Sequence, residues 1–377
     1  MALSIGVPAE TVPGERRVAL VPDVVARVVK QGLQVLVEAG AGDAASYTDA
    51  EYEAQGARVV PREAVFEADV IAKVQPPTEA EIALLKQGQV LVGFLHPLDA
   101  PAVAEKLAAQ GVTALSMELV PRISRAQKMD ALSAMSAVGG YKAVLIAANA
   151  LPRFFPLLTT AAGTIRPASV LVLGAGVAGL QAIATARRLG ARVSAYDIRE
   201  AVREEVQSLG GTFVELPLEI EDMQDAGGYA RALEAEKARR QTELLVPFIA
   251  RADVVISTAL IPGRRAPTLI TEEAVQGMAP GSVIVDMAAA NGGNCVLTEP
   301  DRQVVRHRVQ IFGPTNLPAE MPYHASQMYA RTISAMILEF VRDGAFQPDF
   351  EDDIFAGACV THGGAVVHER VKSLLAA

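Results

Sequence analysis

Three glycines between a short apolar run and a helix-length segment are the feature that most constrains the fold of this 377-residue chain. The run Val170–Leu173 leads into Gly174-Ala-Gly176-Val-Ala-Gly179, and a helical pattern then continues from Leu180 to a stop at Gly190. In such a strand–turn–helix unit the first glycine permits a tight turn and the second lets the backbone approach a ligand, while the third allows close helix–strand packing. The pattern therefore predicts a parallel α/β sheet with a ligand-binding turn at the end of one strand.

The residue that ends the next strand narrows the choice of ligand. The expected strand Arg192–Tyr196 ends at Asp197, eighteen residues after Gly179. A carboxylate there bonds the adenosine ribose 2′-hydroxyl and repels a 2′-phosphate, so NAD is favoured over NADP. Arg199, two residues further on, weakens that preference. A glycine turn in an α/β domain that binds nothing is the alternative, and the strand, helix and acid together make it the weaker interpretation.

Short apolar runs alternate with helical segments along most of the chain. In the N-terminal half of the chain strands are expected at Leu3–Gly6, Gln34–Val37, Val70–Val74, Val90–Leu95 and Val112–Ser116. Further along they are expected at Val170–Leu173, Arg192–Tyr196, Phe213–Leu216, Asp253–Thr258, Ser282–Asp286 and Val309–Phe312. Alternation of this kind is typical of βαβ units and a mostly parallel sheet.

Two long helical patterns suggest how the halves are joined. The stretch Asp130–Asn149 is expected to be a connecting helix, and Ala325–Arg342 a long amphipathic helix. The apolar side of the latter carries Met328, Ile333, Met336 and Ile337. This helix follows the second sheet without strands of its own, so we expect it to pack back on the first domain. The predicted fold class is α/β, with two doubly wound Rossmann-like domains and the second inserted into the first. The domains comprise residues 1–132 with 316–377, and residues 133–315, and the cleft between them is the default binding site.

Composition excludes several classes of protein. With 43 acidic and 34 basic residues the net charge is −9, which argues against nucleic acid as a partner. Hydrophobic residues make up 51%, but the best membrane candidate, Arg166–Arg187, contains Pro167 and three glycines. Its apolar stretches are far shorter than the roughly 20 residues that cross a bilayer, so no spanning segment is expected. The N-terminus lacks the basic region of a signal peptide. Cys295 and Cys359 are expected to be buried thiols, and the histidines have no metal-ligand spacing.

Two groups of polar residues are candidates for a site at the carboxyl edge of the first sheet. In the loop Pro121–Asp130, the side chains of Arg122, Gln127 and Asp130 could hold a carboxamide and a ribose, although a solvated charged loop is an equally good interpretation. In the second group, Arg17 and Lys73 could hold a carboxylate and His96 could protonate an alkoxide. A polar rim with a hydrogen-bonded histidine is the simpler interpretation of that group.

Five segments resemble a known family, the proton-translocating nicotinamide nucleotide transhydrogenases. They are Met117–Asp130, Gly174–Ile183, Ser257–Gly263, Ala290–Cys295 and Thr315–Pro318, and the resemblance extends over almost the whole chain. It implies the soluble NAD(H)-binding component, in the version where the membrane-spanning part is a separate polypeptide. The single-chain α-subunit of the family continues into transmembrane helices, whereas this chain stops at Ala377 without them.

The resemblance also implies a set of site residues. It assigns Arg122, Gln127, Asp130 and Ser133 to the nicotinamide end of NAD(H). The pyrophosphate falls to Gly174, Gly176, Val177, Ala178 and Gly179, and the adenosine ribose to Asp197, Ile198 and Arg199. Further cofactor contacts are Thr258, Ala259 and Leu260. The segment Ala226–Tyr229, with Gly228 and Tyr229, matches a mobile loop that folds over the bound nucleotide.

The implied activity is hydride transfer between NADH on this chain and NADP⁺ on a partner subunit, coupled to proton translocation by a membrane partner. The resemblance further implies a homodimer at the cytoplasmic side of the bacterial inner membrane, held there by its complex and not inserted itself. Passage of hydride between two nicotinamides moves no proton at the reacting carbons and requires only positioning. The proposed site is rich in orienting groups and suits that chemistry.

Alanine dehydrogenase shares the family fold and is the main alternative. Arg17, Lys73 and His96 lie where that enzyme holds and protonates its keto acid. However, its aspartate after the Val-Asp-(Ile/Met)-Ala strand end is replaced here by Ala290. Amino-acid oxidation needs proton transfer as well as hydride transfer, so the loss of an acid counts against it. A non-catalytic NAD-binding module is the third possibility.

Overall fold

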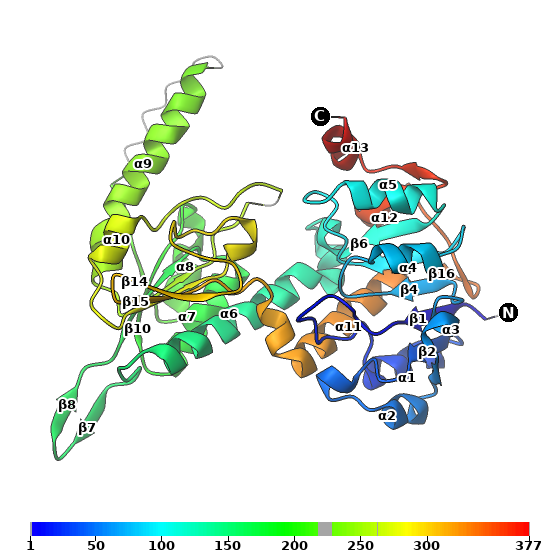
Figure 1. Ribbon diagram of the computed structural model, residues 1–377, viewed down its shortest axis with the longest axis horizontal. Coiled ribbons are helices and arrows are strands. Elements are labelled where there is room, and N and C mark those ends of the chain that lie inside the picture. Colours follow the sequence, from blue (N-terminus) through cyan, green and yellow to red (C-terminus); the bar gives the residue numbers. More distant parts are fainter. Residues whose placement is uncertain (1, 218–227, 262, 377) are drawn as a thin grey trace. The chain divides into compact units, whose positions relative to one another are not determined.

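The chain forms two compact units in the computed structural model, which describes residues 2–217, 228–261 and 263–376, the side chains of 228–235 excepted. Unit 1 consists of Met1–Met135 and Pro318–Ala377, and unit 2 of Ser136–Leu317. Unit 2 is therefore a single stretch of chain, and the two stretches that flank it form unit 1 (Figure 1).

Unit 1 is built on an eight-stranded sheet in the order β19-β18-β6-β5-β4-β1-β2-β3. Its strands are β1 Ser4–Val7, β2 Gln34–Glu38, β3 Arg58–Val60, β4 Val70–Ala72, β5 Val90–Gly93, β6 Thr113–Ser116, β18 Cys359–His362 and β19 Ala365–Val366. Strands β1 to β6 are parallel, while β18 runs antiparallel to both β6 and β19. The order β3-β2-β1-β4-β5-β6 is that of a doubly wound sheet, in which the direction of strand addition reverses between β1 and β4.

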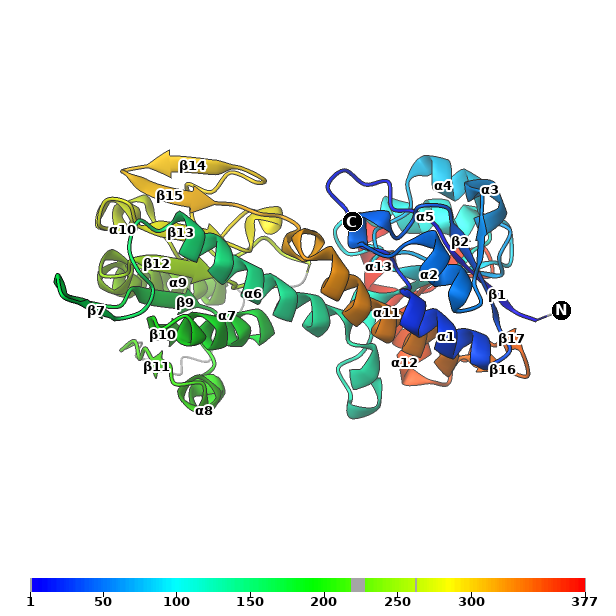
Figure 2. The ribbon, with the colours of Figure 1, turned by 90° about the horizontal axis from the view of Figure 1, so that it is seen from below.

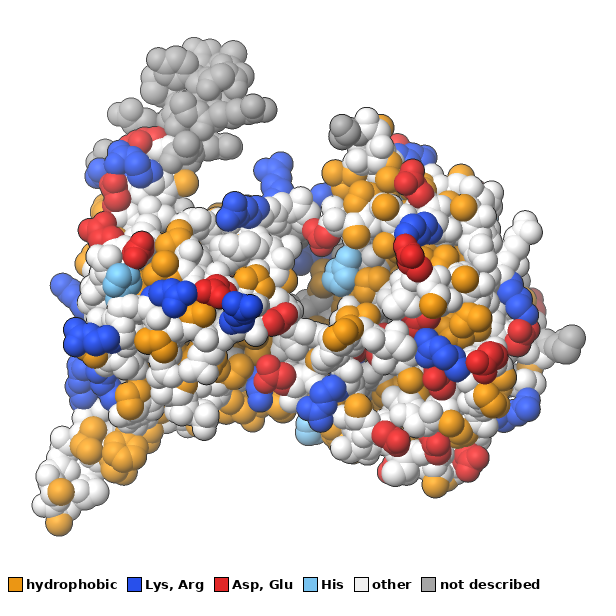
Figure 3. Space-filling model, in the orientation of Figure 1, with side chains coloured by type: hydrophobic (Ala, Val, Ile, Leu, Met, Phe, Trp, Pro, Cys, Tyr) orange, Lys and Arg blue, Asp and Glu red, His pale blue; other side chains and the backbone are white. Residues whose placement is uncertain are grey.

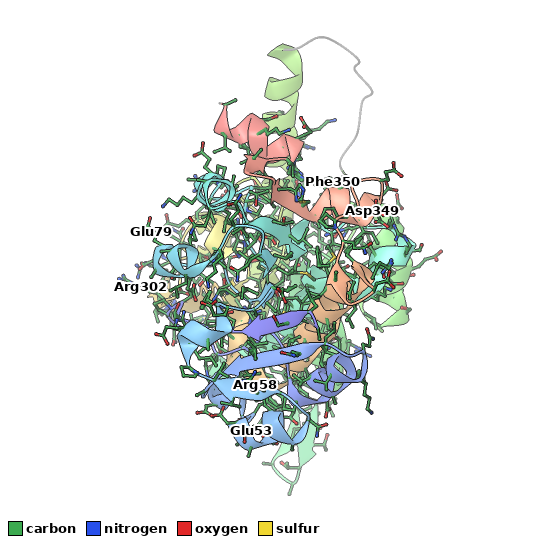
Figure 4. All side chains as sticks on the ribbon, turned by 90° about the vertical axis from the view of Figure 1, so that its right-hand side faces the viewer. Glu53, Arg58, Glu79, Arg302, Asp349 and Phe350 are labelled. Carbon is green, nitrogen blue, oxygen red and sulfur yellow. The ribbon has the colours of Figure 1, made fainter. Side chains whose placement is uncertain are left out.

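Helices cover both faces of this sheet. On one face an apolar cluster joins Ile71 and Leu91 of the strands to residues of the following helices or their ends: α3 Arg62–Val65, α4 Glu79–Leu84, α5 Ala102–Ala109 and α13 Glu369–Leu375. Elsewhere α1 Pro22–Lys30 packs on α11 Pro322–Glu339, and α1 also contacts β2 while α11 contacts β5. Two further helices are α2 Asp49–Ala54 and α12 Asp353–Ala358. Figure 4 labels Glu53 of α2 and Arg58 of the edge strand β3.

Unit 2 repeats the same strand order. Its seven-stranded sheet runs β11-β10-β9-β12-β13-β15-β14, parallel except for the edge strand β14. The strands are β9 Ser169–Leu173, β10 Arg192–Tyr196, β11 Thr212–Phe213, β12 Val254–Ser257, β13 Val283–Asp286, β14 Gln303–Arg306 and β15 Val309–Phe312. The reversal lies between β9 and β12, at the end of β9 where the glycine turn begins.

Helices lie along both faces of the unit 2 sheet (Figure 2). An apolar cluster fills the space on each face. One face packs against α6 Ala131–Ala150, α7 Val177–Arg188 and α8 Arg203–Ser208, through residues such as Val144, Ile183 and Val206. The other packs against α9 Gly228–Ala250 and α10 Glu272–Gln276, through Ile249 and Val275. Because both faces are covered, the strands read as continuous apolar runs.

The predicted fold class is confirmed: the protein is α/β with two Rossmann-like parallel sheets. The long helix after the second sheet belongs to unit 1, as expected, and buries Ile333, Met336 and Ile337. Its predicted end at Arg342 is wrong. The helix ends at Glu339, because Val341–Arg342 (β16) pairs with Ala345–Phe346 (β17) across a tight turn at Asp343-Gly344, both with positive φ.

The segment that best meets the length and hydropathy of a membrane span is not the one expected from the sequence. The window Arg166–Arg187 is divided between β9, the glycine turn and α7. Among the described residues one helix, α6, is long and apolar enough by length and composition to cross a membrane, and 44% of the relevant window is buried inside the protein. Its Ala143, Val144 and Ala147 belong to the core of unit 2.

A two-stranded hairpin, β7 Leu158–Thr160 and β8 Gly163–Ile165, stands apart from the large sheets and projects from unit 2 (Figure 1). Sequence patterning did not predict it. Three large apolar side chains on it and just before it, Phe154, Leu157 and Ile165, are about half exposed at 51%, 56% and 46%. Figure 3 shows hydrophobic side chains gathered along the hairpin and at its base.

Candidate functional site

The glycine turn after β9 is shaped by two residues that the chain itself requires to be glycine. Gly174 has φ +97°, and a Cβ there would lie 2.7 Å from Oγ1 of Thr258. A Cβ on Gly179 would lie 1.9 Å from the carbonyl oxygen of Gly174. Any side chain at Gly179 would therefore push α7 away from the strand that precedes it.

Gly176 is different, because the space beside it is open. The nearest heavy atom to a Cβ there would be Nη2 of Arg199, at 4.0 Å. Helix α7 begins at the next residue and has no side-chain cap among the described residues. Free N–H groups and the positive end of the helix dipole thus lie beside an open space at a backbone without a side chain. These residues fit a pyrophosphate.

Asp197 follows β10 and connects this strand to the glycine turn. Its Oδ2 accepts a 2.8 Å hydrogen bond from the N–H of Ala175, and its two oxygens accept bonds of 3.0 and 2.9 Å from Nε and Nη2 of Arg199. Burial opposes ionisation of the carboxyl, but the hydrogen bonds from Arg199 and from backbone N–H groups outweigh it and lower its pKa. Asp197 is therefore a carboxylate, and a ribose hydroxyl that bonds it must share it with Arg199.

Exposed apolar side chains follow the carboxyl ends of three neighbouring strands. Val177 comes after β9, Ile198 after β10, and Leu260 and Ile261 after β12, and Ile198 is 77% exposed. Solvent-exposed apolar groups around a turn with a few fixed polar atoms are typical of a site for a flat ring such as a nucleotide base.

A buried asparagine holds the segment after β12 that contains Thr258, Ala259 and Leu260. The Asn294 amide donates to the carbonyls of Ala259 and Pro267 at 2.9 and 2.8 Å, and it accepts from the N–H of Ala259 at 3.1 Å. Thr258 in turn donates its hydroxyl to the carbonyl of Gly174 at 3.0 Å. The loop after β12 and the glycine turn after β9 are thus fixed to one another at the switch point of the sheet.

Asp286 stabilises the end of the neighbouring strand β12 and the loop after β13. It is fully buried at the end of β13 and accepts hydrogen bonds from Ser257, Thr298 and the N–H groups of Ala288 and Cys295. Each carboxylate oxygen therefore has two donors, which is what a buried charge requires.

The two cysteines are buried free thiols, as expected, and burial raises the pKa of Cys295 to about 11 and that of Cys359 to about 12.

In unit 1 the loop predicted to bind the nicotinamide includes two short 3₁₀ helices, η2 Met117–Leu119 and η3 Ser124–Met129. Arg122 and Gln127 are exposed. Asp130 is half-buried and bonds Ser133 twice, to its N–H at 2.8 Å and to its hydroxyl at 2.5 Å. The structure thus joins Asp130 to Ser133 at the first turn of α6 and leaves the side chains of Arg122 and Gln127 in solvent.

The Arg17, Lys73 and His96 group separates into distinct contacts. Lys73 is fully buried after β4 and forms ion pairs with Glu10 at 3.1 Å and Glu81 at 3.0 Å. Arg17 forms a bidentate pair with Glu15, with bonds of 2.8 and 2.6 Å. Both cations are therefore already neutralised by carboxylates.

His96 has a carboxylate partner of its own. It lies after β5 with φ +48°, and its backbone N–H bonds the carboxylate of Glu118, whose Oε1 is 3.7 Å from Nδ1 of the ring. His96 and Lys73 thus face different glutamates. The sequence did not predict Glu10, Glu81 or Glu118; for Glu10 the signal that could have found it is its place just after the first strand.

The segment Ala226–Tyr229 falls partly on residues 218–227, which lie outside the described residues. Gly228 and Tyr229 are at the start of α9, with their side chains also outside that description. Among the residues that the structure does describe, no group of three or more His, Cys, Asp or Glu side chains could hold a metal ion.

Two protein-family models match this chain. The family model described as "Alanine dehydrogenase/PNT, N-terminal domain" matches residues 6–139, and "Alanine dehydrogenase/PNT, C-terminal domain" matches residues 143–369. The chain belongs to the alanine dehydrogenase/PNT family.

The chain is similar to both transhydrogenase subunits and alanine dehydrogenases. An NAD(P) transhydrogenase subunit alpha protein of Rhodospirillum rubrum is 46% identical over 97% of this chain and 98% of its own length. The subunit alpha of Cereibacter sphaeroides is 45% identical over all of this chain and 73% of its own length. Alanine dehydrogenase of Mycobacterium tuberculosis is 31% identical over 98% and 96%.

Solved structures of the family agree with the observed fold. A transhydrogenase from Sinorhizobium meliloti matches with a TM-score of 0.88 and 41% identity, covering 97% of this chain and all of that one. An L-alanine dehydrogenase matches with a TM-score of 0.84 and 28% identity, covering 99% of both. The resemblance to transhydrogenases inferred from the five segments is confirmed, with alanine dehydrogenase as the related member of the family.

Proposed function

We propose that this chain is the NAD(H)-binding catalytic subunit of a proton-translocating transhydrogenase. Hydride passes between NADH bound here and NADP⁺ bound on a partner subunit, and a membrane-spanning partner couples this transfer to proton translocation. The observation that carries the proposal is the open space at Gly176, beside the uncapped start of α7 and next to Asp197. A dinucleotide needs this combination of phosphate cradle and ribose acceptor.

In this proposal each of the two predicted domains contacts a different part of the nucleotide. The 133–315 domain binds the nucleotide through Gly174, Gly176, Val177, Ala178 and Gly179 at the pyrophosphate. Asp197, Ile198 and Arg199 hold the adenosine ribose, and Thr258, Ala259, Leu260, Gly228 and Tyr229 complete the contacts. The other domain, residues 1–132 with 316–377, supplies Arg122, Gln127 and Asp130 to the nicotinamide end, and Ser133, the first residue of the 133–315 domain, completes this group.

Bound NADH supplies the hydride, and the residues of this chain bind and orient it. In the proposed reaction Gln127 and Arg122 hold the carboxamide, while Asp130, fixed by Ser133, holds the neighbouring ribose. Transfer requires the two nicotinamide carbons to be about 3–3.5 Å apart with water excluded, and no side chain needs to move a proton. The exposed position of Arg122 and Gln127 leaves them available for this contact.

The proposed complex contains two copies of this chain, an NADP(H)-binding subunit and a membrane-spanning subunit. This chain would lie at the cytoplasmic side of the bacterial inner membrane without entering it. The exposed apolar side chains of the β7–β8 hairpin support a partner surface on unit 2, because large apolar groups in water favour association.

The direct test is to mix the purified chain with the NADP(H)-binding partner subunit and follow NADH-driven reduction of an NADP⁺ analogue. We expect turnover only when both proteins are present. If the loop of unit 1 only supports the structure, Gln127→Asn leaves this rate unchanged; a fall in rate with normal thermal stability supports its role at the nicotinamide.

Alanine dehydrogenase activity is the second candidate, because the polar cluster around Arg17 and Lys73 is present. Ala290, exposed in the turn Ala289–Asn291 after β13, supplies no carboxylate at the position of the dehydrogenase aspartate. The chain with NAD⁺ and L-alanine is therefore expected to be inert, and robust NADH production would overturn the transhydrogenase proposal. A non-catalytic NAD-binding module would bind NADH yet give no transfer with the partner.

A further inference from the structure

The 3₁₀ helix η3 sorts its residues into three rows. With three residues per turn, positions i and i+3 lie above one another. One row, Ala126 and Met129, is buried. A second row consists of Arg125 and Lys128, and the third of Ser124 and Gln127, continued by Asp130 at the end of the helix. The third row contains two of the residues proposed for the nicotinamide end, so the direction in which this row points determines how the cofactor is held.

The second row is attached to the C-terminal segment of unit 1 by ion pairs. Nη1 of Arg125 is 2.7 Å from Oδ2 of Asp352 and 3.5 Å from Oε1 of Glu339. Nζ of Lys128 is 2.7 Å from Oε2 of Glu339. Glu339 is the last residue of α11, and Asp352 caps α12 by accepting the N–H of Ile354 at 2.8 Å.

The loop that presents Asp352 is itself fixed by aromatic packing. Figure 4 labels Asp349 and Phe350 in this loop, just before α12. The Phe350 ring makes edge contacts with the rings of Phe355 and His362, with centroid–centroid distances of 5.0 and 5.1 Å. The acidic partners of η3 therefore lie at the end of the long helix α11 and in a loop that packs on α12, and side chains supported in this way can position a neighbouring segment.

These ion pairs contribute little to global stability. Arg125 and Lys128 are about half exposed, and exposed pairs typically give about 0–1 kcal/mol each. A short 3₁₀ helix has poor intrinsic hydrogen bonding, so its orientation depends on its attachments. The buried row fixes η3 along one side, and the ion-paired row on a second side fixes its rotation about its own axis. These two attachments together determine the direction in which the third row points.

We propose that Arg125 and Lys128 are positioning residues for the nicotinamide end of the bound NAD(H), acting through Glu339 and Asp352. By the same geometry Ser124 belongs to the ligand-facing row with Gln127 and Asp130. This inference rests on the proposed function, since it requires NAD(H) to contact this loop.

The test compares NADH with ADP-ribose, which carries the adenosine and pyrophosphate but no nicotinamide. Dissociation constants for both are measured by calorimetry on the full chain, as wild type and as Arg125→Met, Lys128→Met and the double variant. Arg125→Lys retains the charge and serves as the conservative rescue. Lys372→Met is the matched control, because it removes an exposed ion pair with Glu369 in α13 of the same unit.

In the double variant we expect NADH binding to weaken about threefold to tenfold, because small misplacements of orienting groups are costly. Binding of ADP-ribose and the thermal midpoint should remain as in wild type, Arg125→Lys should recover most of the NADH affinity, and Lys372→Met should change nothing. Equal weakening of both ligands, or no weakening of either, would overturn the inference. Failure of the wild-type chain to bind NADH would instead overturn the proposed function.

Discussion

The carbonyl oxygen of Gly174 accepts a 3.0 Å hydrogen bond from the hydroxyl of Thr258, and the same oxygen lies 1.9 Å from the position a Cβ of Gly179 would take. One backbone atom thus has a side chain from the loop after β12 on one side and the first turn of α7 on the other. The turn therefore has no room for a side chain at Gly174 or Gly179, whereas the space beside Gly176 is open.

The glycines of the turn should therefore respond differently to alanine. Gly179→Ala must displace α7 or the turn and is expected to cost about 1–3 kcal/mol of the free energy of unfolding. Gly176→Ala meets no heavy atom closer than 4.0 Å, so it should unfold like wild type yet lose NADH binding. Chemical denaturation and calorimetric titration measure the two effects. Normal NADH affinity in Gly176→Ala would contradict the placement of the pyrophosphate.

The pair formed by Asp197 and Arg199 should set the preference between NADH and NADPH. Asp197→Asn removes the negative charge and one of the two acceptor oxygens at the ribose, and it should weaken NADH binding by about tenfold, in the range of a charge-assisted hydrogen bond. Arg199→Ala removes a cation close to the 2′ position, so it should increase discrimination against NADPH. Parallel titrations with both nucleotides give the ratio of the NADPH dissociation constant to the NADH dissociation constant. If Arg199→Ala lowers the ratio instead, the arginine acts only as a support for Asp197.

Two buried glutamates of unit 1 should have opposite effects on the pH dependence of stability. Burial opposes ionisation of Glu15, but the hydrogen bonds and charge of Arg17 outweigh it and lower its pKa from 4.5 to about 2. Its stabilising contribution is thus complete above about pH 5 and is lost as the pH falls toward 2. Burial raises the pKa of Glu10 despite Lys73, so its contribution declines as the pH rises above 4.5.

Denaturation of wild type, Glu15→Gln and Glu10→Gln between pH 2 and pH 7 checks these signs. The stability difference between wild type and Glu15→Gln should shrink on acidification, from about 2–4 kcal/mol near neutrality. The difference between wild type and Glu10→Gln should change in the other direction. Slopes of the same sign in both variants would contradict the assignment.

Asn294 should tolerate removal better than a change to a carboxylate. Asn294→Ala leaves the N–H of Ala259 and the carbonyls of Ala259 and Pro267 without their partner, at about 1–3 kcal/mol. Asn294→Asp is expected to cost more, because a buried carboxylate would face those two carbonyl oxygens. Thermal unfolding ranks the variants. The opposite ranking would mean that the segment after β12 rearranges around the substitution.

The hairpin β7–β8 should determine association of the chain with itself. We expect the wild type to sediment at twice 39.7 kDa, and the double variant Leu157→Ser, Ile165→Ser to sediment as a monomer. The driving force is burial of apolar surface, worth about 25 cal/mol per Å². Leu374→Ser, in an exposed position of α13, is the control and should leave the assembly unchanged. A monomeric wild type would refute the homodimer.

The sequence predicted the central strands well because each is buried on both faces and therefore strongly apolar. The fully buried strands Val254–Ser257 and Val283–Asp286 lie within the expected ranges Asp253–Thr258 and Ser282–Asp286. Arg192–Tyr196 and Val309–Phe312 are only partly buried, yet they have the expected bounds. The edge strands β3 and β14 escaped prediction, since Arg58 and Gln303 face solvent and break the apolar run. β18 escaped too, because pairing of Cys359 with Leu115 joins residues more than 240 positions apart.

The candidate site was predictable where its chemistry is local in sequence. The glycines and Asp197 lie within one strand–helix–strand unit, so their spacing carries the signal. The partners of Lys73 carry no such signal: Glu81 is only eight positions away but lies in α4, and Glu10 is 63 positions away and reaches Lys73 only because the sheet order places β1 beside β4. The same holds for Arg125 and Asp352, which meet across 227 positions.

The shared strand order of the two sheets has a consequence for stoichiometry. Unit 1 repeats the topology that places a dinucleotide at the switch point, but after β1 its chain continues as Pro8-Ala9-Glu10, and the Glu10 carboxylate accepts bonds from the N–H of Val74 and from Lys73. A carboxyl side chain, paired with Lys73, thus occupies the position at which unit 2 offers glycine and free N–H groups. A calorimetric titration should therefore saturate at one equivalent of NADH per chain, although the chain contains the architecture twice.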